Sequence, residues 1–367
     1  MNKEEYIKSI YDIAYLSSCA INKLIPDKNR VESMNIANLY IASHRHMMSA
    51  IVAMALESAG INNRDFSQDK GKSIRKNIAF DVERKEIQHK FEECGIWYMH
   101  LKGIVLKDFY PSIGMRQMSD NDILIDATRA NDVKTIMESL GYTTGKSFGF
   151  GAHDVYTKKP IFDFEMHRSL FVNEHNVVFS DYYKDIKKRL IKNDEGNYGY
   201  HFSDEDFYIF MIAHEFKHYS SSGTGIRSLF DTYVYLKQKS DSLNWTYISE
   251  ELDKLKLSDF EKSNRLLSID LFETGILTND EKEIINHFYS SGAYGSITQS
   301  INNQITKKGK IGYLISCAFP SYRTMKISFP FIKYCPIMLP FCWIIRFFKS
   351  LVLYPKKVLA IIKALFQ

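Results

Sequence analysis

The chain has 367 residues, of which 45% are hydrophobic and 25% charged, so its composition is that of an ordinary globular protein with two or three packed units. Its five cysteines form no CxxC pair, which argues against a disulfide framework and against a cysteine zinc site. The net charge of +5 conceals a split, because residues 284–367 contain 11 Lys and Arg and no acid, whereas residues 1–283 carry 43 acids.

The first half of the chain predicts helices followed by a mixed α/β unit. Apolar residues recur at helical spacing, and glycines mark the helix ends at Gly60, Gly95 and Gly141. Short apolar runs bounded by turn residues predict strands. The expected elements are helices over 38–59 and 78–94, a strand over 96–101, a short helix from 104 to before 111, a loop over 112–119, a strand over 121–126, a helix over 129–140, and strands over 155–157 and 161–167.

From residue 204 onward the pattern is helical again, with helices expected over 204–219, 226–239, 246–255, 258–274 and 279–289. Helices, a central α/β unit and further helices together predict an α+β architecture. We expect an N-terminal helical segment (1–93), an α/β core (94–200), a helical domain (201–310) and a basic amphipathic tail (311–367).

Two acidic strands carry the clearest chemical signal. Residues two apart in a strand point to one face, so Asp120 and Asp122 project together, as do Asp163, Glu165 and His167. Converging carboxylates repel one another unless a cation lies between them, and Mg²⁺ prefers such oxygen ligands. The pattern predicts a site for a divalent metal and a nucleoside triphosphate, with ordinary solvated acids at a strand edge as the alternative.

Several short motifs resemble one known family. They are Leu101-Lys102-Gly103, Tyr110-Pro111, Gly114-Met115-Arg116, Asp120-Asn121-Asp122, Glu165-Met166-His167, the pair His214 and His218, and the pair Arg227 and Asp231. Over roughly residues 35–350 the chain resembles the uncharacterised nucleotidyltransferase family of bacteria, which belongs to the polymerase-beta-like nucleotidyltransferase superfamily and often accompanies polysaccharide biosynthesis genes. Asn121 stands where that superfamily usually has an apolar residue.

The resemblance implies a polymerase-beta-like core and transfer of a nucleoside monophosphate, with ATP as the expected donor, to an unknown acceptor, in surface-polysaccharide synthesis. The catalytic residues, which would also bind Mg²⁺ or Mn²⁺, would be Asp120, Asp122 and Glu165. Asp163 is a second candidate for the third carboxylate. Nucleotide-binding roles would fall to Lys102, Gly103, Arg116 and His167. A structural role for His167 stays open, and so does a catalytically inactive nucleotide-binding scaffold.

The run from His214 to His218 also spells HExxH, the zinc metalloprotease signature. Two histidines four apart share a helix face and can bind Zn²⁺, with Glu215 as general base and Glu250 or Glu251 as third ligand. Arg227 and Asp231 are also four apart and can pair on their helix. Their alternative role, as a wall of the nucleotide pocket, comes from the resemblance.

The tail predicts a membrane contact. Only 12 residues separate Lys333 from Arg346, which we take as too few for a spanning helix. Within 343–366, five cations share one side of a helical wheel and apolar residues such as Phe347, Leu351 and Leu365 the other, with Pro355 dividing the helix; the five are Arg346, Lys349, Lys356, Lys357 and Lys363.

Such a helix suits an anionic membrane surface, and closure of the helical core is the alternative. The cations lack the aromatic interleaving of a nucleic-acid site, so no nucleic-acid partner is expected. The polar, acidic first residues resemble no secretory signal, and we expect a cytoplasmic protein, peripheral to the inner face of the membrane if the tail binds there.

Overall fold

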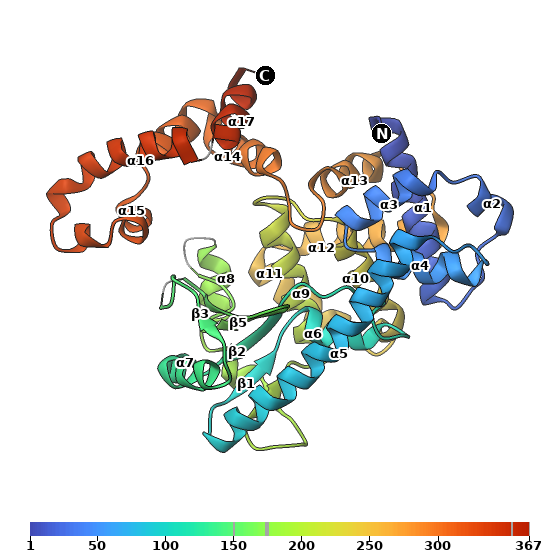
Figure 1. Cartoon of the computed structure of the whole chain (residues 1–367), viewed down its shortest axis with the longest axis horizontal. Coiled ribbons are helices and arrows are strands. Elements are labelled where there is room, and N and C mark those ends of the chain that lie inside the picture. Colours follow the sequence, from blue (N-terminus) through green and yellow to red (C-terminus); the bar gives the residue numbers. More distant parts are fainter. Residues whose placement is uncertain (150, 173–175, 354, 367) are drawn as a thin grey trace.

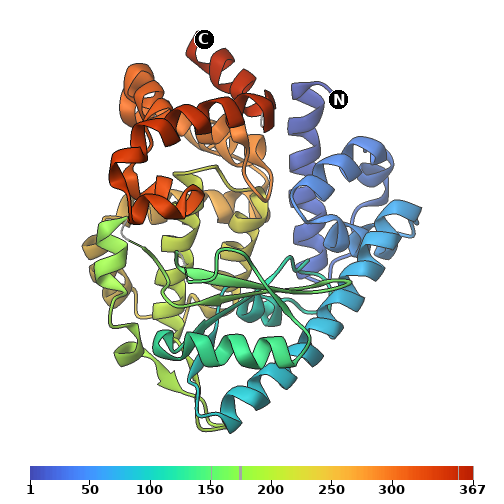
Figure 2. The same cartoon turned by 60° about the vertical axis from the view of Figure 1, so that its left-hand side comes forward.

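The computed structural model of the chain describes residues 1–149, 151–172, 176–353 and 355–366. The side chains of residues 323, 327, 356, 357, 365 and 366 lie outside this description, and with them Lys356, Lys357 and Leu365 of the expected amphipathic helix. A central sheet has helices on both faces, and a helical arm follows near the C-terminus (Figures 1 and 2).

Seven strands form one mixed sheet in the order β3-β4-β5-β2-β1-β7-β6. Their bounds are Tyr98–His100 (β1), Asn121–Ile125 (β2), Thr143–Thr144 (β3), His153–Lys158 (β4), Phe162–His167 (β5), Ile191–Lys192 (β6) and Gly199–His201 (β7). β2 pairs in parallel with β5, and β1 with β7, while the other neighbours are antiparallel. The expectation of a mixed sheet combined with helices is confirmed.

Strand alternation gives the two faces of the sheet different neighbours. Ile123 of β2 packs in an apolar core with α5 (Arg64–Glu93) and α7 (Ala130–Ser139). Leu124, on the opposite face, packs in a second core with α9 (Asp204–Tyr219). Asp122 shares the face of Leu124, so the carboxylates of the predicted metal site belong to the α9 side of the sheet.

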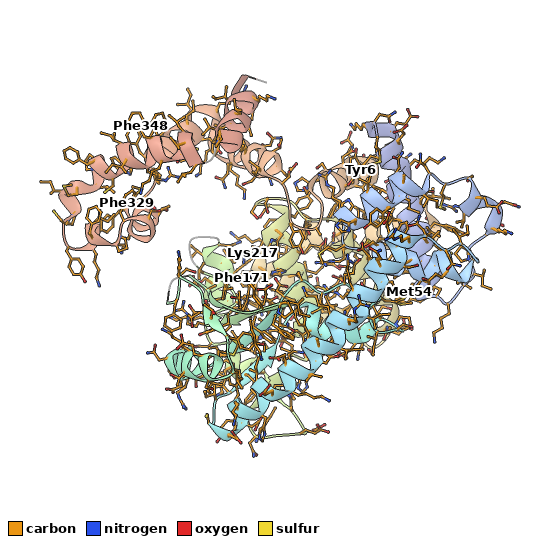
Figure 3. The ribbon with its side chains drawn as sticks, viewed as in Figure 1. Tyr6, Met54, Phe171, Lys217, Phe329 and Phe348 are labelled. Carbon is orange, nitrogen blue, oxygen red and sulfur yellow. The ribbon has the colours of Figure 1, made fainter. Side chains whose placement is uncertain are left out.

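The N-terminal helices share a core with helices from the second half of the chain. These are α1 (Lys3–Ile21), α2 (Lys28–Glu32), α3 (Ile36–Arg45), α4 (Ser49–Ser58), α10 (Ile226–Lys239), α12 (Ser258–Ile269) and α13 (Asn279–Ser291). Tyr6 of α1, labelled in Figure 3, donates a 3.2 Å hydrogen bond to the carbonyl of Tyr289 in α13. The first helices therefore depend on a segment more than two hundred residues away in sequence.

Two N-terminal helices differ from the expectation. The chain turns at Met47 (φ +55°), so residues 38–59 form α3 and α4 instead of one helix. α5 begins well before residue 78 because the Asn63 side chain accepts hydrogen bonds from the backbone N–H groups of Asp65 and Phe66 and so caps the helix at Arg64.

The remaining elements of the body are short or lie beyond the sheet. They are α6 (Gly103–Leu106), α8 (Val177–Tyr182), α11 (Trp245–Leu255), the 3₁₀ turns η1 (Lys107–Phe109), η2 (Ala127–Arg129) and η3 (Ile186–Arg189), and the π-helical turn η4 (Asp270–Thr274). The helices expected from residue 204 onward are all present.

The C-terminal arm is the segment 310–366. It follows the first half of α14 (Ile297–Ala318), which is held to the body by Asn303 and kinks at Gly309 (φ +70°). The arm continues through α15 (Tyr322–Ser328), η5 (Pro330–Lys333), η6 (Pro336–Met338), α16 (Leu339–Leu353) and α17 (Pro355–Phe366). α15 and α16 stand away from the sheet (Figure 1), and α17 begins at Pro355, as expected.

Among the described residues, one helical stretch is long and apolar enough to cross a membrane by length and composition. It comprises Pro336–Leu353, 18 residues with a mean hydropathy of 1.6. The expectation that the tail is too short is wrong, because Arg346 and Lys349 fall inside this window without ending it. Only 6% of the window is buried, so α16 does not close the core of the helical domain.

Candidate active site

Asp122 and Glu165 lie side by side across two parallel strands. The register of β2 and β5 sets Asp122 opposite Glu165, and Asp120 directly precedes β2. All three residues line one cavity of about 350 Å³, whose other walls include Lys217 of α9 and Arg227 of α10. The carboxylates that the strand pattern predicted to converge therefore face a common space.

The carboxylate of Asp122 is buried and already has two partners. Lys102 Nζ donates to its Oδ1 at 2.9 Å, and His167 Nε2 lies 2.6 Å from the same oxygen. Burial alone would raise the pKa of Asp122, but the Lys102 ammonium and His167 outweigh burial and hold this pKa well below its usual range. This environment therefore favours the ionised form of Asp122.

Asp120 has the opposite environment. Burial raises the pKa of its carboxyl, and the negative charges of Asp122 and Glu165 raise it further. A hydrogen bond of 2.7 Å from the Ser119 hydroxyl offsets only part of this effect. A divalent cation among these oxygens would remove the repulsion. Among the described residues, the side chains that already lie close enough together to share one ion are His153, Glu165 and His167.

His153, Glu165 and His167 form a compact group of metal-ligand side chains. The Nε2 atoms of His153 and His167 lie 3.4 and 3.5 Å from Glu165 Oε2. The atoms that the three residues can offer to a metal ion all lie within 4.8 Å of one another. Burial lowers the pKa of His153, which favours the neutral imidazole that a metal requires.

Sequence reasoning missed His153. The antiparallel register of β4 and β5 sets it opposite His167. The signal was the hairpin itself: once Lys158 is paired with Phe162 across the turn at 159–161, counting back along both strands pairs the two histidines.

Two other acidic-strand residues lie apart from the cavity. Asp163 shares the face of Glu165 by strand alternation but is exposed and does not line the cavity, so the geometry favours Glu165 as third carboxylate. Asn121 points to the opposite face of the sheet, where its Oδ1 accepts from Arg84 of α5. The departure from an apolar residue at this position therefore leaves the carboxylates on either side unchanged.

Lys102 and Gly103 both line the cavity. Lys102 has a left-handed backbone (φ +48°), an unusual conformation for a residue with a side chain, and from it reaches Asp122. A Cβ on Gly103 would clash with Nη1 of Arg116, so this glycine makes room for the guanidinium.

Arg116 is paired with a residue far along the chain. Its Nε and Nη2 each donate to one oxygen of Asp231 at 2.8 Å, and the Tyr110 hydroxyl donates to the same carboxylate at 2.7 Å. The expectation that Asp231 pairs with Arg227 is therefore wrong, because the bidentate fork of Arg116 occupies both of its oxygens.

Arg227 and Lys217 are the cations that these pairings leave facing the cavity. Among the described residues, Nη1 of Arg227 donates to two neutral acceptors, the Gln117 carbonyl and the Met47 sulfur. Burial lowers the pKa of both side chains; the charge of Lys102 lowers that of Lys217 further, and the charge of Arg116 lowers that of Arg227 further. Lys217, labelled beside Phe171 in Figure 3, was not predicted because its role depends on the packing of α9 against the sheet.

The HExxH residues do not form a zinc site. His214 and His218 share a face of α9 with their Nε2 atoms 3.1 Å apart, and burial lowers the pKa of both, to about 4 for His218. Glu215 is turned elsewhere and accepts from Asn264 Nδ2 at 2.9 Å. In the described part of the chain no third His, Cys, Asp or Glu joins the two histidines as a metal group.

The proposed third zinc ligands are also elsewhere. Glu251 accepts a 3.1 Å hydrogen bond from Arg189, and Glu250 is exposed; neither lines the cavity. The zinc-protease alternative is therefore not supported by the geometry.

Carboxylates and cations line the same cavity, an arrangement that suits an anionic substrate with a bound metal ion. A family model described as "uncharacterised nucleotidyltransferase" matches residues 32–273, and the chain belongs to that family. The protein is thus a nucleotidyltransferase, a transferase of phosphorus-containing groups, as the motif resemblance predicted. No curated protein and no solved structure matches the chain.

Proposed function

We propose that the protein transfers a nucleoside monophosphate from a nucleoside triphosphate to an acceptor, with divalent metal held by Asp120, Asp122 and Glu165. The observation that carries this proposal is the parallel register of β2 and β5, which sets Asp122 beside Glu165 on the cavity wall. Bound metal would neutralise the triphosphate and stabilise charge on the attacking and leaving oxygens of an in-line displacement.

The basic side chains around the cavity have separate roles in this proposal. Lys217 and Arg227 bind the phosphates, since both line the cavity and neither forms an ion pair with a described residue. Lys102 contributes a third cation next to the metal ligands. Arg116 positions this wall through Asp231 instead of binding phosphate, because Nε and Nη2 donate to Asp231 and Nη1 donates to the Met118 sulfur.

The metal in this proposal is Mg²⁺ or Mn²⁺. Carboxylate oxygens suit both ions, but imidazole nitrogens suit transition metals better than Mg²⁺. His153 and His167 flank Glu165 within ligand distance of a shared ion, so the donor set favours Mn²⁺.

The donor in this proposal is ATP and the acceptor a precursor of a surface polysaccharide. Both assignments rest on the family resemblance. Labelled ATP, CTP, GTP and UTP, each incubated with the protein, Mn²⁺ or Mg²⁺ and cell extract, test them through the released pyrophosphate and the labelled product.

Asp120→Asn tests the catalytic assignment. We expect transfer to fall roughly hundredfold or more. Asp163→Asn is the matched control, since it removes an exposed carboxylate from the strand that carries Glu165, and it should keep full activity. Nucleotide binding without pyrophosphate release over the whole panel would instead indicate an inactive scaffold, and equal losses in both variants would contradict the assignment.

A further inference from the structure

One side of α16 is exposed and entirely apolar. At 100° per residue its members fall within about 120° of the helical wheel. They are 41–78% exposed: Phe341, Ile344, Ile345, Phe348, Leu351 and Val352. This set is called the α16 apolar face below; Figure 3 labels Phe348.

The other side of α16 packs against the arm itself. Cys342 is fully buried in a small core with Phe329, and Trp343 Nε1 donates to the Pro320 carbonyl at 3.0 Å. The two charged residues of the stretch Pro336–Leu353, Arg346 and Lys349, also lie on the side of α16 that packs against the arm. Arg346 donates to the Cys317 carbonyl at 3.0 Å, and Lys349 Nζ lies 5.5 Å from the ring centre of Phe329.

This arrangement makes α16 two-sided despite its high overall hydropathy. A helix that crossed a bilayer would carry Arg346 and Lys349 into hydrocarbon, where such charges are strongly disfavoured. A helix lying in the membrane plane would bury the α16 apolar face and keep both cations on the protein side. The side chains therefore favour an in-plane helix over a spanning one.

The charge of the arm indicates which partner binds the α16 apolar face. Within the arm, residues 310–366, the sequence has 9 Lys and Arg and no acid. Two copies of the arm would repel each other across a shared interface, whereas anionic lipid headgroups would attract each one. We propose that the α16 apolar face docks the protein on an anionic membrane surface, with α16 in the plane of the bilayer.

Flotation of the full chain with vesicles tests this proposal, and no nucleotide is needed, so the result is independent of the proposed transfer activity. We expect flotation with phosphatidylglycerol-containing vesicles and much less with pure phosphatidylcholine. Phe348→Glu with Val352→Glu, at sites 61% and 78% exposed, should lower partitioning roughly tenfold or more.

The matched control is Val82→Glu with Ile276→Glu, which adds the same charge at body positions that are 63% and 76% exposed. It should retain flotation. The proposal is overturned if the wild type floats with neither vesicle, or if the control loses as much as the α16 variant. A wild type that is dimeric without lipid, and monomeric as the α16 variant, would assign the face to a second copy and overturn it as well.

Discussion

Asp231→Ala is expected to destabilise the protein severely. Arg116 and Asp231 are 8% and 6% exposed and are joined by two hydrogen bonds of 2.8 Å, with a third to the carboxylate from Tyr110. Removing the carboxylate leaves a buried guanidinium without its counter-charge, which costs about 3–5 kcal/mol. Since domains are stable by only about 5–15 kcal/mol, this is a large fraction of the total.

Urea unfolding followed by circular dichroism measures the change in the free energy of unfolding. The double variant Arg116→Met with Asp231→Leu should recover most of the loss, because it leaves no unpaired charge behind. The double variant should also bind nucleoside triphosphate with near wild-type affinity, since Arg116 is assigned to positioning.

Two results would refute this reasoning. A loss below about 1 kcal/mol for Asp231→Ala would mean that solvent or another group satisfies Arg116. A double variant that is folded but no longer binds nucleotide would mean that Arg116 binds phosphate directly.

Three further predictions concern the site and its support. Burial raises the pKa of Glu215 from 4.5 to about 7, so its protonated form is favoured on folding and its contribution to stability falls as the pH rises through that window. The free energy of unfolding of Glu215→Gln, measured in urea, should therefore exceed that of the wild type by up to about 3 kcal/mol near pH 8 and by little near pH 4.5. A difference between the two proteins that does not change with pH would contradict this. Gly103→Ala should cost about 1–3 kcal/mol in the same assay, because its Cβ displaces Arg116, and the cost should shrink when Arg116 is already Met. His153→Ala should weaken Mn²⁺ binding roughly tenfold or more but Mg²⁺ binding less, read from metal-induced shifts in melting temperature; equal losses would remove His153 from the ligand set.

Long, periodic elements were predictable from the sequence. The helix expected over 204–219 matches α9 because Ser203 caps it, accepting from the Asp206 backbone N–H, and its apolar residues repeat over four turns. Strands of two or three residues, such as β3 and β6, are too short to show a period. The break at Met47 depends on packing across the N-terminal core, which no local pattern encodes.

The site was predictable to the extent that it is local. Alternation along a strand was enough to bring Asp120 and Asp122 together. The Arg116–Asp231 pair joins residues 115 positions apart and required the path of α10, so helical spacing suggested the wrong partner for Asp231.

The contact between Lys102 and Asp122 has a consequence for the order of ligand loading. The Lys102 ammonium neutralises this carboxylate from 2.9 Å away, so an ion that binds the same Oδ1 has to compete with it. A free ion must displace the lysine unaided, whereas a triphosphate arriving with its ion offers the released ammonium a new counter-charge. Nucleotide and ion should therefore bind cooperatively, each raising the affinity of the protein for the other.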